Sequence, residues 1–336
     1  MLKVDVFNHI FPKPFFRRLE EVAVNKGAIK RFLHIPYLHE LDVRFRMIDE
    51  FGGDYRQIVS LSAPPIETIN PDRQITIDLA KLANDSQAEV VRAHSDRIPG
   101  FIASLPLNQP DASVAELERA VTQLGALGVQ VFSNVNGLPL DDDRFTPLFE
   151  TADRLNCPIL LHPARGAGFP DYPGESKSKY EIWWTFGWPF ETSAAMQRLV
   201  FSRLFDRLPN IRIVTHHLGA MIPYFEGRIG PGWDQLGART SDVDYAAVLK
   251  KLAKRPLDYF RMFYADTALF GAYDATVCGL RFFGADHVVF ASDAPFDPEK
   301  GPMYIRETIA IVDRLPVSDD ERERIYWRNA AALLKL

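Results

Sequence analysis

Four residues that can bind a metal ion lie at the ends of short apolar runs that are far apart in the sequence: His9, His162, His217 and Asp293. Neutral imidazoles combined with a carboxylate form a ligand set suited to zinc and other divalent transition metals. A single histidine at such a place is more often structural than catalytic. Four such residues at corresponding places predict one shared site, provided that the apolar runs are neighbouring strands.

The apolar runs recur at intervals that leave room for a helix between each pair. We count eight candidate strands: Lys3–Phe7, Gln57–Leu61, Ile98–Leu105, Gly128–Ser133, Pro158–His162, Ile211–His216, Met262–Asp266 and His287–Ser292. Amphipathic segments such as Ala112–Leu127, Arg144–Asn156 and Glu191–Leu208 lie between them. Apolar strands that alternate with helices favour a parallel sheet covered by helices. Eight such units predict an α/β fold, a (β/α)8 TIM barrel, whose strands carry the chemistry at their carboxyl ends.

Size and composition fit one barrel domain over residues 1–336, since 47% of the residues are hydrophobic and 25% are charged. A net charge of −5 offers no basic surface for nucleic acid. No apolar stretch approaches the roughly 18–20 residues needed to cross a bilayer, so no membrane association is expected. Two cysteines without a CxxC pair, and an N-terminus without a secretory signal, favour a cytoplasmic location.

Two segments are longer than a barrel requires: residues 12–41 after the first strand and residues 165–188 after the fifth. The second is aromatic and contains glycine, so we predict a pocket wall or lid, with a plain surface loop as the alternative. It contains Arg165, which could neutralise a substrate carboxylate. It also contains Trp183, Trp184 and Trp188, which could enclose an aromatic or conjugated ring together with Phe296, although aromatic clusters are commonly ordinary core.

Five sequence segments carry a pattern that covers essentially the whole chain. They are VDVFNHIFP at Val4–Pro12, LLHP at Leu160–Pro163, HLGAMIPYFEGRI at His217–Ile229, FASDAPF at Phe290–Phe296 and IYWRNAAALLKL at Ile325–Leu336. This pattern is similar to the amidohydrolase-related family that includes aminocarboxymuconate-semialdehyde decarboxylase and γ-resorcylate decarboxylase. The resemblance implies an amidohydrolase-type barrel, a small-molecule carboxylate substrate, and a homodimer or higher homo-oligomer.

The resemblance also implies roles for individual residues. His9, His162 and Asp293 would bind one divalent metal ion, with zinc preferred over manganese or magnesium. His217 would be the catalytic acid–base histidine, working with Asp293. Arg228 resembles an arginine that in some relatives reaches a neighbouring subunit's site, where its guanidinium can bind a substrate carboxylate bidentately. The alternative for Arg228 is a surface or packing role.

Position 7 departs from the family pattern, which usually opens with His-x-His or Glu-x-His, because this chain has Phe7-Asn8-His9. Strand alternation places Phe7 and His9 on the inward face and Asn8 on the other face. Phe7 therefore occupies a ligand position, where it could contact substrate but cannot bind a metal. Three protein ligands suffice for catalytic zinc, and His217 could move inward as a fourth. His216 should point the opposite way and serve as buried packing, with one ring nitrogen hydrogen-bonded.

Two metal-dependent reactions and one metal-free alternative remain open. The first is non-oxidative decarboxylation of a small aromatic or unsaturated carboxylic acid, in which Asp293 or His217 manages the proton that replaces CO2. The second is metal-dependent hydrolysis of an ester, lactone or amide. The third is a metal-free enzyme or a non-catalytic binding protein, if Phe7 has abolished metal binding.

Arg44 and Arg46 lie in a segment that resembles the family's helix before the second strand. The resemblance implies that an arginine there could contact substrate, and the alternative is a salt bridge on a helix surface.

Overall fold

Eight parallel strands form one sheet in the computed structural model, which describes residues 1–27 and 29–336. In spatial order they are β1 (Lys3–His9), β2 (Tyr55–Ser60), β3 (Gly100–Ala103), β4 (Gly128–Phe132), β7 (Ile159–His162), β8 (Ile213–Thr215), β9 (Tyr264–Asp266) and β10 (Val288–Val289). Backbone bonds from Val6 N to Phe290 O, at 3.0 Å, and from His9 N to Ala294 O, at 2.9 Å, join the last strand to the first. The predicted (β/α)8 barrel is confirmed, and each of the eight expected runs overlaps a strand of the barrel.

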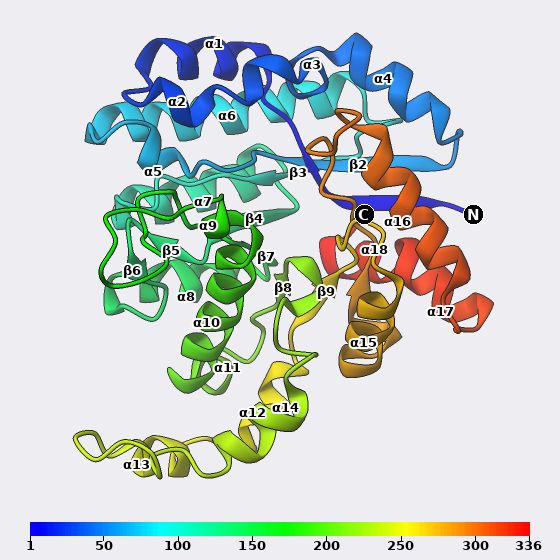
Figure 1. Ribbon diagram of the computed structural model, residues 1–336. Helices are drawn as coiled ribbons and strands as arrows, with labels where there is room; N and C mark the ends of the chain where they lie inside the picture. The colour runs from blue at the N-terminus through cyan, green and yellow to red at the C-terminus, as the bar shows by residue number, and fades with distance from the viewer.

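Helices follow the strands and cover the outside of the barrel (Figure 1). They are α1 (Lys13–Val22), α2 (Lys26–Ile29), α3 (Pro36–His39), α4 (Leu41–Glu50), α5 (Ile66–Ile69), α6 (Arg73–Ala93), α7 (Pro110–Gln123), α8 (Thr146–Arg154), α9 (Ile182–Thr185), α10 (Gly187–Phe201), α11 (Leu204–Arg207), α12 (Glu226–Trp233), α13 (Tyr245–Lys250), α14 (Pro256–Phe260), α15 (Tyr273–Phe283), α16 (Pro302–Arg314), α17 (Asp319–Glu323) and α18 (Asn329–Leu334). Local signals set several starts: the Asp72 side chain accepts from Ile75 N at the start of α6, and Pro110 opens α7. No helix among the described residues is long and apolar enough to cross a membrane.

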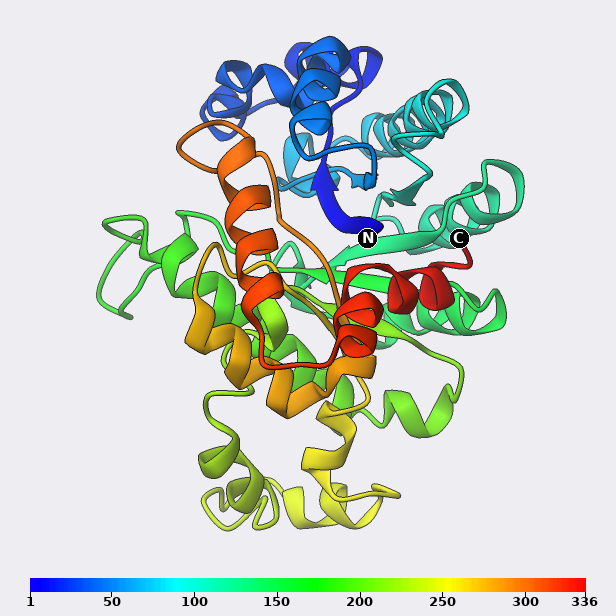
Figure 2. The ribbon, with the colours of Figure 1, turned by 90° about the vertical axis from the view of Figure 1, so that its right-hand side faces the viewer.

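The segments that depart from a minimal barrel differ in structure. Residues 12–41 form α1, α2, a short 3-10 helix (η1, Phe32–His34) and α3, and α1 packs along α6. Residues 165–188 are mostly turns, and they contain the short helix α9 and the first residues of α10. The segment from α12 to α14 extends away from the strands at the bottom of Figures 1 and 2.

Two apolar layers pack on the two faces of the strands. The outward side chains meet the surrounding helices, while inward ones such as Ile58, Leu160 and Val214 fill the barrel and pack against Leu333 of α18. Figure 2 shows these C-terminal helices, in red, against the strands. Because α18 closes the amino-terminal end of the barrel, only the carboxyl ends of the strands are left to form a site.

Strand β1 is not regular. Its pairing with β2 shifts between Asp5, opposite Gln57, and Asn8, opposite Val59, so β1 contains one extra residue there. Phe7 belongs to the inner apolar layer and Asn8 bonds to polar groups behind the strand. The bulge does not turn Asn8 into the barrel.

Candidate active site

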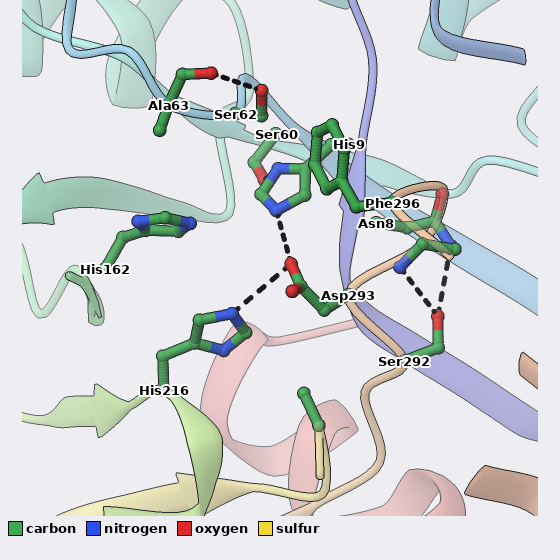
Figure 3. A network of polar contacts seen from close by, with 12 residues as sticks. Asn8, His9, Ser60, Ser62, Ala63, His162, His216, Ser292, Asp293 and Phe296 are labelled. Carbon is green, nitrogen blue, oxygen red and sulfur yellow. Dashed lines mark hydrogen bonds and ion pairs between the residues drawn. The ribbon is translucent and has the colours of Figure 1, made fainter. Parts of the chain in front are cut away.

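Five ionisable side chains meet at the carboxyl end of the barrel: His9, His162, His216, His217 and Asp293 (Figure 3 labels all but His217). All five are buried. Asp293 is at the centre, because its Oδ1 lies 2.8 Å from His9 Nε2 and 3.3 Å from His216 Nε2, and its Oδ2 lies 3.7 Å from His217 Nε2. The ligand atoms of His9, His162 and Asp293 all lie within 4.8 Å of one another. The three predicted metal ligands are thus brought together.

Three of the imidazoles are held by their Nδ1 atoms, so that Nε2 faces the cluster. His9 Nδ1 lies 3.1 Å from Leu61 O, His162 Nδ1 lies 2.7 Å from Pro163 O, and His216 Nδ1 bonds to Asp266 Oδ2. Such a second partner fixes the ring orientation and the tautomer, and it is the usual support of a metal-binding histidine.

His216 does not point away from the cluster, so its predicted orientation was wrong, although it is buried and one ring nitrogen is hydrogen-bonded as expected. Strand β8 ends at Thr215, and the chain then turns sharply, with positive φ at both His217 and Leu218. Alternation therefore stops just before the histidine pair, and both rings enter the site with centroids 3.8 Å apart. The sequence signal that could have revealed this is the glycine at 219, two residues after the pair, which is typical of a tight turn.

Burial and mutual charge set the protonation of the cluster. Burial disfavours charge on His216, but Asp266 and Asp293 outweigh it and raise the pKa of His216 to about 10. Burial also opposes ionisation of Asp293, yet the charge of His216 and bonds from three histidines hold the pKa of Asp293 well below its usual value. Burial, together with repulsion from His216, lowers the pKa of His217 and holds that of His162 well below the usual range.

Aromatic rings surround the cluster. Phe7 is fully buried, and its ring centroid lies 4.2 Å from that of His216 in a stacked arrangement and 5.7 Å from that of His9. Phe296 lies 5.4 Å from His9, and Trp188 lies 5.5 Å from His162. Phe7 therefore lies inside the barrel beside the ligands, as strand alternation predicted.

The remaining predicted substrate-binding residues lie in different environments. Arg165 forms an ion pair with Glu191 at 3.0 Å, so its charge is already compensated. Trp184 is half-buried on α9, and its ring makes no aromatic contact with the cluster in the described part of the chain. Arg228 is exposed on α12 and has no ion pair within the described residues.

Arg44 is not at the substrate side of the barrel and is not on a helix surface. It is fully buried behind β1, where it donates to Asn8 Oδ1 and Gln57 Oε1, each at 2.7 Å, and to the carbonyl of His9. Its position under the strand makes it a support of His9, and the expected contact with substrate is not found. A buried arginine has no distinct signal in sequence, since its partners come from remote segments.

A small cavity adjoins the cluster at the ends of β2, β3 and β4. Apolar side chains and two polar ones line it, among them Leu61, Leu105, Phe132, Ser104 and Gln130. Phe132 also contacts the His162 ring at 5.2 Å. Within the described residues, Ser104 Oγ and Gln130 Oε1 are buried without a hydrogen-bond partner, so each can bond to a polar group of a ligand. Sequence analysis did not identify either residue, because neutral polar residues in apolar strands give no catalytic pattern.

The donor set suits one divalent cation. His216 Nε2 lies 3.3 Å from Asp293 Oδ1, and the carboxylates that stabilise positive charge on His216 would stabilise a metal ion beside it. Strand β4 carries no lysine that could bridge a second metal.

Comparison with known proteins gives three kinds of match. The family model described as amidohydrolase matches residues 39–336. γ-Resorcylate decarboxylase from Rhodococcus jostii (strain RHA1) is 35% identical over 311 residues, covering 88% of this chain and 87% of the relative. 2-Amino-3-carboxymuconate-6-semialdehyde decarboxylase from Dictyostelium discoideum is 30% identical over 355 aligned residues, which cover 100% of this chain and 92% of the relative. The structure of a dihydroxybenzoic acid decarboxylase from Polaromonas sp. JS666, with bound manganese and the inhibitor 2-nitroresorcinol, matches with a TM-score of 0.77 at 27% identity. The match covers 100% of this chain and 97% of that structure.

Proposed function

The chain belongs to the amidohydrolase family, as its sequence motifs predicted, and from this premise we propose that it catalyses metal-dependent, non-oxidative decarboxylation of a small aromatic or unsaturated carboxylic acid. The observation that carries the proposal is the cluster of His9, His162, His217 and Asp293 at the mouth of the barrel. The relatives support it, since both similar sequences and the Polaromonas structure are of decarboxylases.

His9, His162 and Asp293 would hold the divalent cation. When bound, it would supply positive charge that orients substrate oxygens and offsets negative charge in the transition state. Zinc is the metal that the ligand types favour, and manganese is the metal that the Polaromonas relative binds. Both are candidates here.

His217 is placed to manage the proton. In the reaction the bond between the carboxylate and its carbon breaks, the electron pair stays on that carbon, and a proton replaces the CO2 that leaves. His217 Nε2 lies 3.7 Å from Asp293 Oδ2, and His217 Nδ1 is buried without a hydrogen-bond partner among the residues that the structure describes. The low pKa of Asp293 keeps its carboxylate ionised, so it can stabilise the imidazolium of His217 while that ring holds the proton.

Aromatic side chains beside the cluster favour an aromatic acid. Phe296 lies 5.4 Å from His9 and Trp188 lies 5.5 Å from His162, so both rings can contact a conjugated substrate. The small cavity lined by Ser104 and Gln130 has space for a water molecule or for one polar group of a ligand. Ser104 Oγ and Gln130 Oε1 have no hydrogen-bond partner in the described part of the chain, so they can donate to and accept from a hydroxyl placed there.

Release of CO2 from a panel of hydroxybenzoates and muconate-type acids tests the proposal, using protein loaded in turn with zinc and manganese. Turnover of at least one acid, lost on chelation, is the expected result. The same side chains could instead activate water, so a parallel panel of esters, lactones and amides is included. Turnover of that panel without CO2 release would assign the chain to hydrolysis, and activity that persists without metal would remove the metal from the proposal.

A further inference from the structure

We propose that His216 replaces the metal ligand that position 7 does not provide, so that the cation is held by His9, His162, His216 and Asp293. The inference rests on the metal-dependent site of the proposed function and adds a ligand from β8 to it. Figure 3 shows His216 facing Asp293 across the cluster from His9.

The separations of the donor atoms support a shared cation. His216 Nε2 lies 3.3 Å from Asp293 Oδ1, the same oxygen that lies 2.8 Å from His9 Nε2. Two donors bound to one zinc at roughly 2.0–2.1 Å in a tetrahedron are about 3.3 Å apart. His217 lies beside the other oxygen, Oδ2, at 3.7 Å. The donor atoms of His216, His217 and Asp293 form a second group within 4.8 Å of one another, and this group shares Asp293 with the first. His9 and His216 approach the same oxygen of Asp293, whereas His217 approaches the other oxygen, which leaves His217 for proton transfer.

The surroundings of His216 are those of a ligand. Its Nδ1 bonds to Asp266 Oδ2, and Asp266 Oδ1 accepts from Ala268 N at 3.0 Å, so the carboxylate itself is fixed. Both side chains are fully buried. His216 Nε2 faces the cluster and lies 3.3 Å from Asp293 Oδ1. A carboxylate on one ring nitrogen and a second nitrogen directed at another proposed ligand form the arrangement that orients metal-binding histidines.

Phe7 explains why the proposed ligand comes from the segment after β8 and not from β1. Its ring occupies the inward position on β1 and stacks on His216 with centroids 4.2 Å apart, at an interplanar angle of 21°. A phenyl ring cannot bind a metal, but its face holds the imidazole in place. The donor missing on β1 and the donor gained after β8 are therefore in direct contact.

A titration of the metal-depleted full-length protein with Co²⁺, followed by visible absorption and by competition with a chelator, tests the inference. His216→Asn is expected to weaken Co²⁺ binding by more than about 100-fold, beyond the roughly 10–100-fold that loss of an outer-sphere partner causes. Asp266→Asn should fall within that smaller range. His94→Asn, which removes an imidazole at the opposite end of the barrel after α6, should leave binding unchanged. Adding Phe7→His to His216→Asn should restore most of the lost affinity.

X-ray absorption of the wild-type Zn²⁺ protein provides a measurement that does not depend on folding of a variant, and three imidazole ligands are expected. Two imidazoles, or wild-type Co²⁺ affinity and spectrum in a folded His216→Asn variant, would overturn the inference. These readouts are independent of catalysis. Three imidazole ligands without CO2 release would support the role of His216 and contradict the proposed function. Two imidazole ligands with metal-dependent CO2 release would contradict the role of His216 and support the proposed function.

Discussion

Glu67 is a buried acid beside the candidate substrate cavity, and its replacement by glutamine gives a quantitative test of the structure. It lies on α5, next to Ile66, which lines the cavity. Its side chain is 3% exposed, and neither carboxylate oxygen has a hydrogen-bond partner within the described residues. Burial therefore raises the pKa of Glu67 from 4.5 to about 8.

The sign and size of the effect follow from this pKa. Between about pH 4.5 and 8 the folded protein keeps a proton on Glu67 that the unfolded chain releases. The contribution of Glu67 to the free energy of unfolding is therefore greatest below pH 4.5. It falls as the pH rises to about 8, and above that pH it no longer changes. A pKa difference of about 3.5 corresponds to roughly 5 kcal/mol. Glutamine resembles the protonated acid at every pH, so Glu67→Gln removes this loss.

Urea denaturation of wild type and Glu67→Gln at about pH 5 and about pH 8.5 measures the difference. The two proteins should unfold at similar urea concentrations at the lower pH, and the variant should be more stable by several kcal/mol at the higher pH. Glu89→Gln, an exposed change on α6, is the control and should behave as wild type. An equal gap between Glu67→Gln and wild type at both pH values would refute the reasoning.

Four further changes test the site. Asp293→Asn should reduce kcat by about 10²–10⁴-fold while the protein stays folded; near-wild-type kcat would contradict its assignment. Phe7→His should tighten Co²⁺ binding measured by chelator competition, and unchanged affinity would show that residue 7 does not reach the cation. Ser104→Ala should lower kcat/KM by about tenfold for hydroxybenzoates but not for the unsubstituted acid, and an equal loss for both would place no hydroxyl at this side chain. Arg228→Ala should raise KM by about 10–100-fold if the arginine binds the substrate carboxylate in a neighbouring copy, whereas unchanged KM would make it a surface residue.

Sequence reasoning succeeds where one short pattern determines the outcome. The apolar runs at regular intervals predict all eight strands, and the ends of three strands place His9, His162 and Asp293 together. It fails where the outcome depends on the exact end of a strand. The alternation of inward and outward side chains along β8 ends at Thr215, and for that reason the direction of the His216 side chain was predicted wrongly.

Residues whose partners come from remote segments were also missed. Gln130 and Ser104 are neutral side chains inside or just after apolar strands, and only the barrel brings them to one cavity. Glu67 follows a proline-rich turn, where a carboxylate is normally exposed, and it is buried because α5 packs against α6. In each case the decisive fact is three-dimensional packing, which local periodicity does not report.

A buried polar network explains how the cluster keeps its geometry around the bulge in β1. Asp5 accepts from Ser292 N at 3.0 Å and from Tyr55 OH at 2.6 Å, and Ser292 directly precedes Asp293. Asn8 donates to Asp5 at 3.1 Å and accepts from Arg44, which also donates to the His9 carbonyl. The first strand and the loop after the last strand are thus joined behind the site by buried hydrogen bonds, which are costly to break. Because this network fixes the backbones of His9 and Asp293, the bulge can present Phe7 to the barrel without displacing either neighbour. Under the proposed exchange of ligands, His216, whose ring stacks on Phe7, supplies the donor that position 7 lacks.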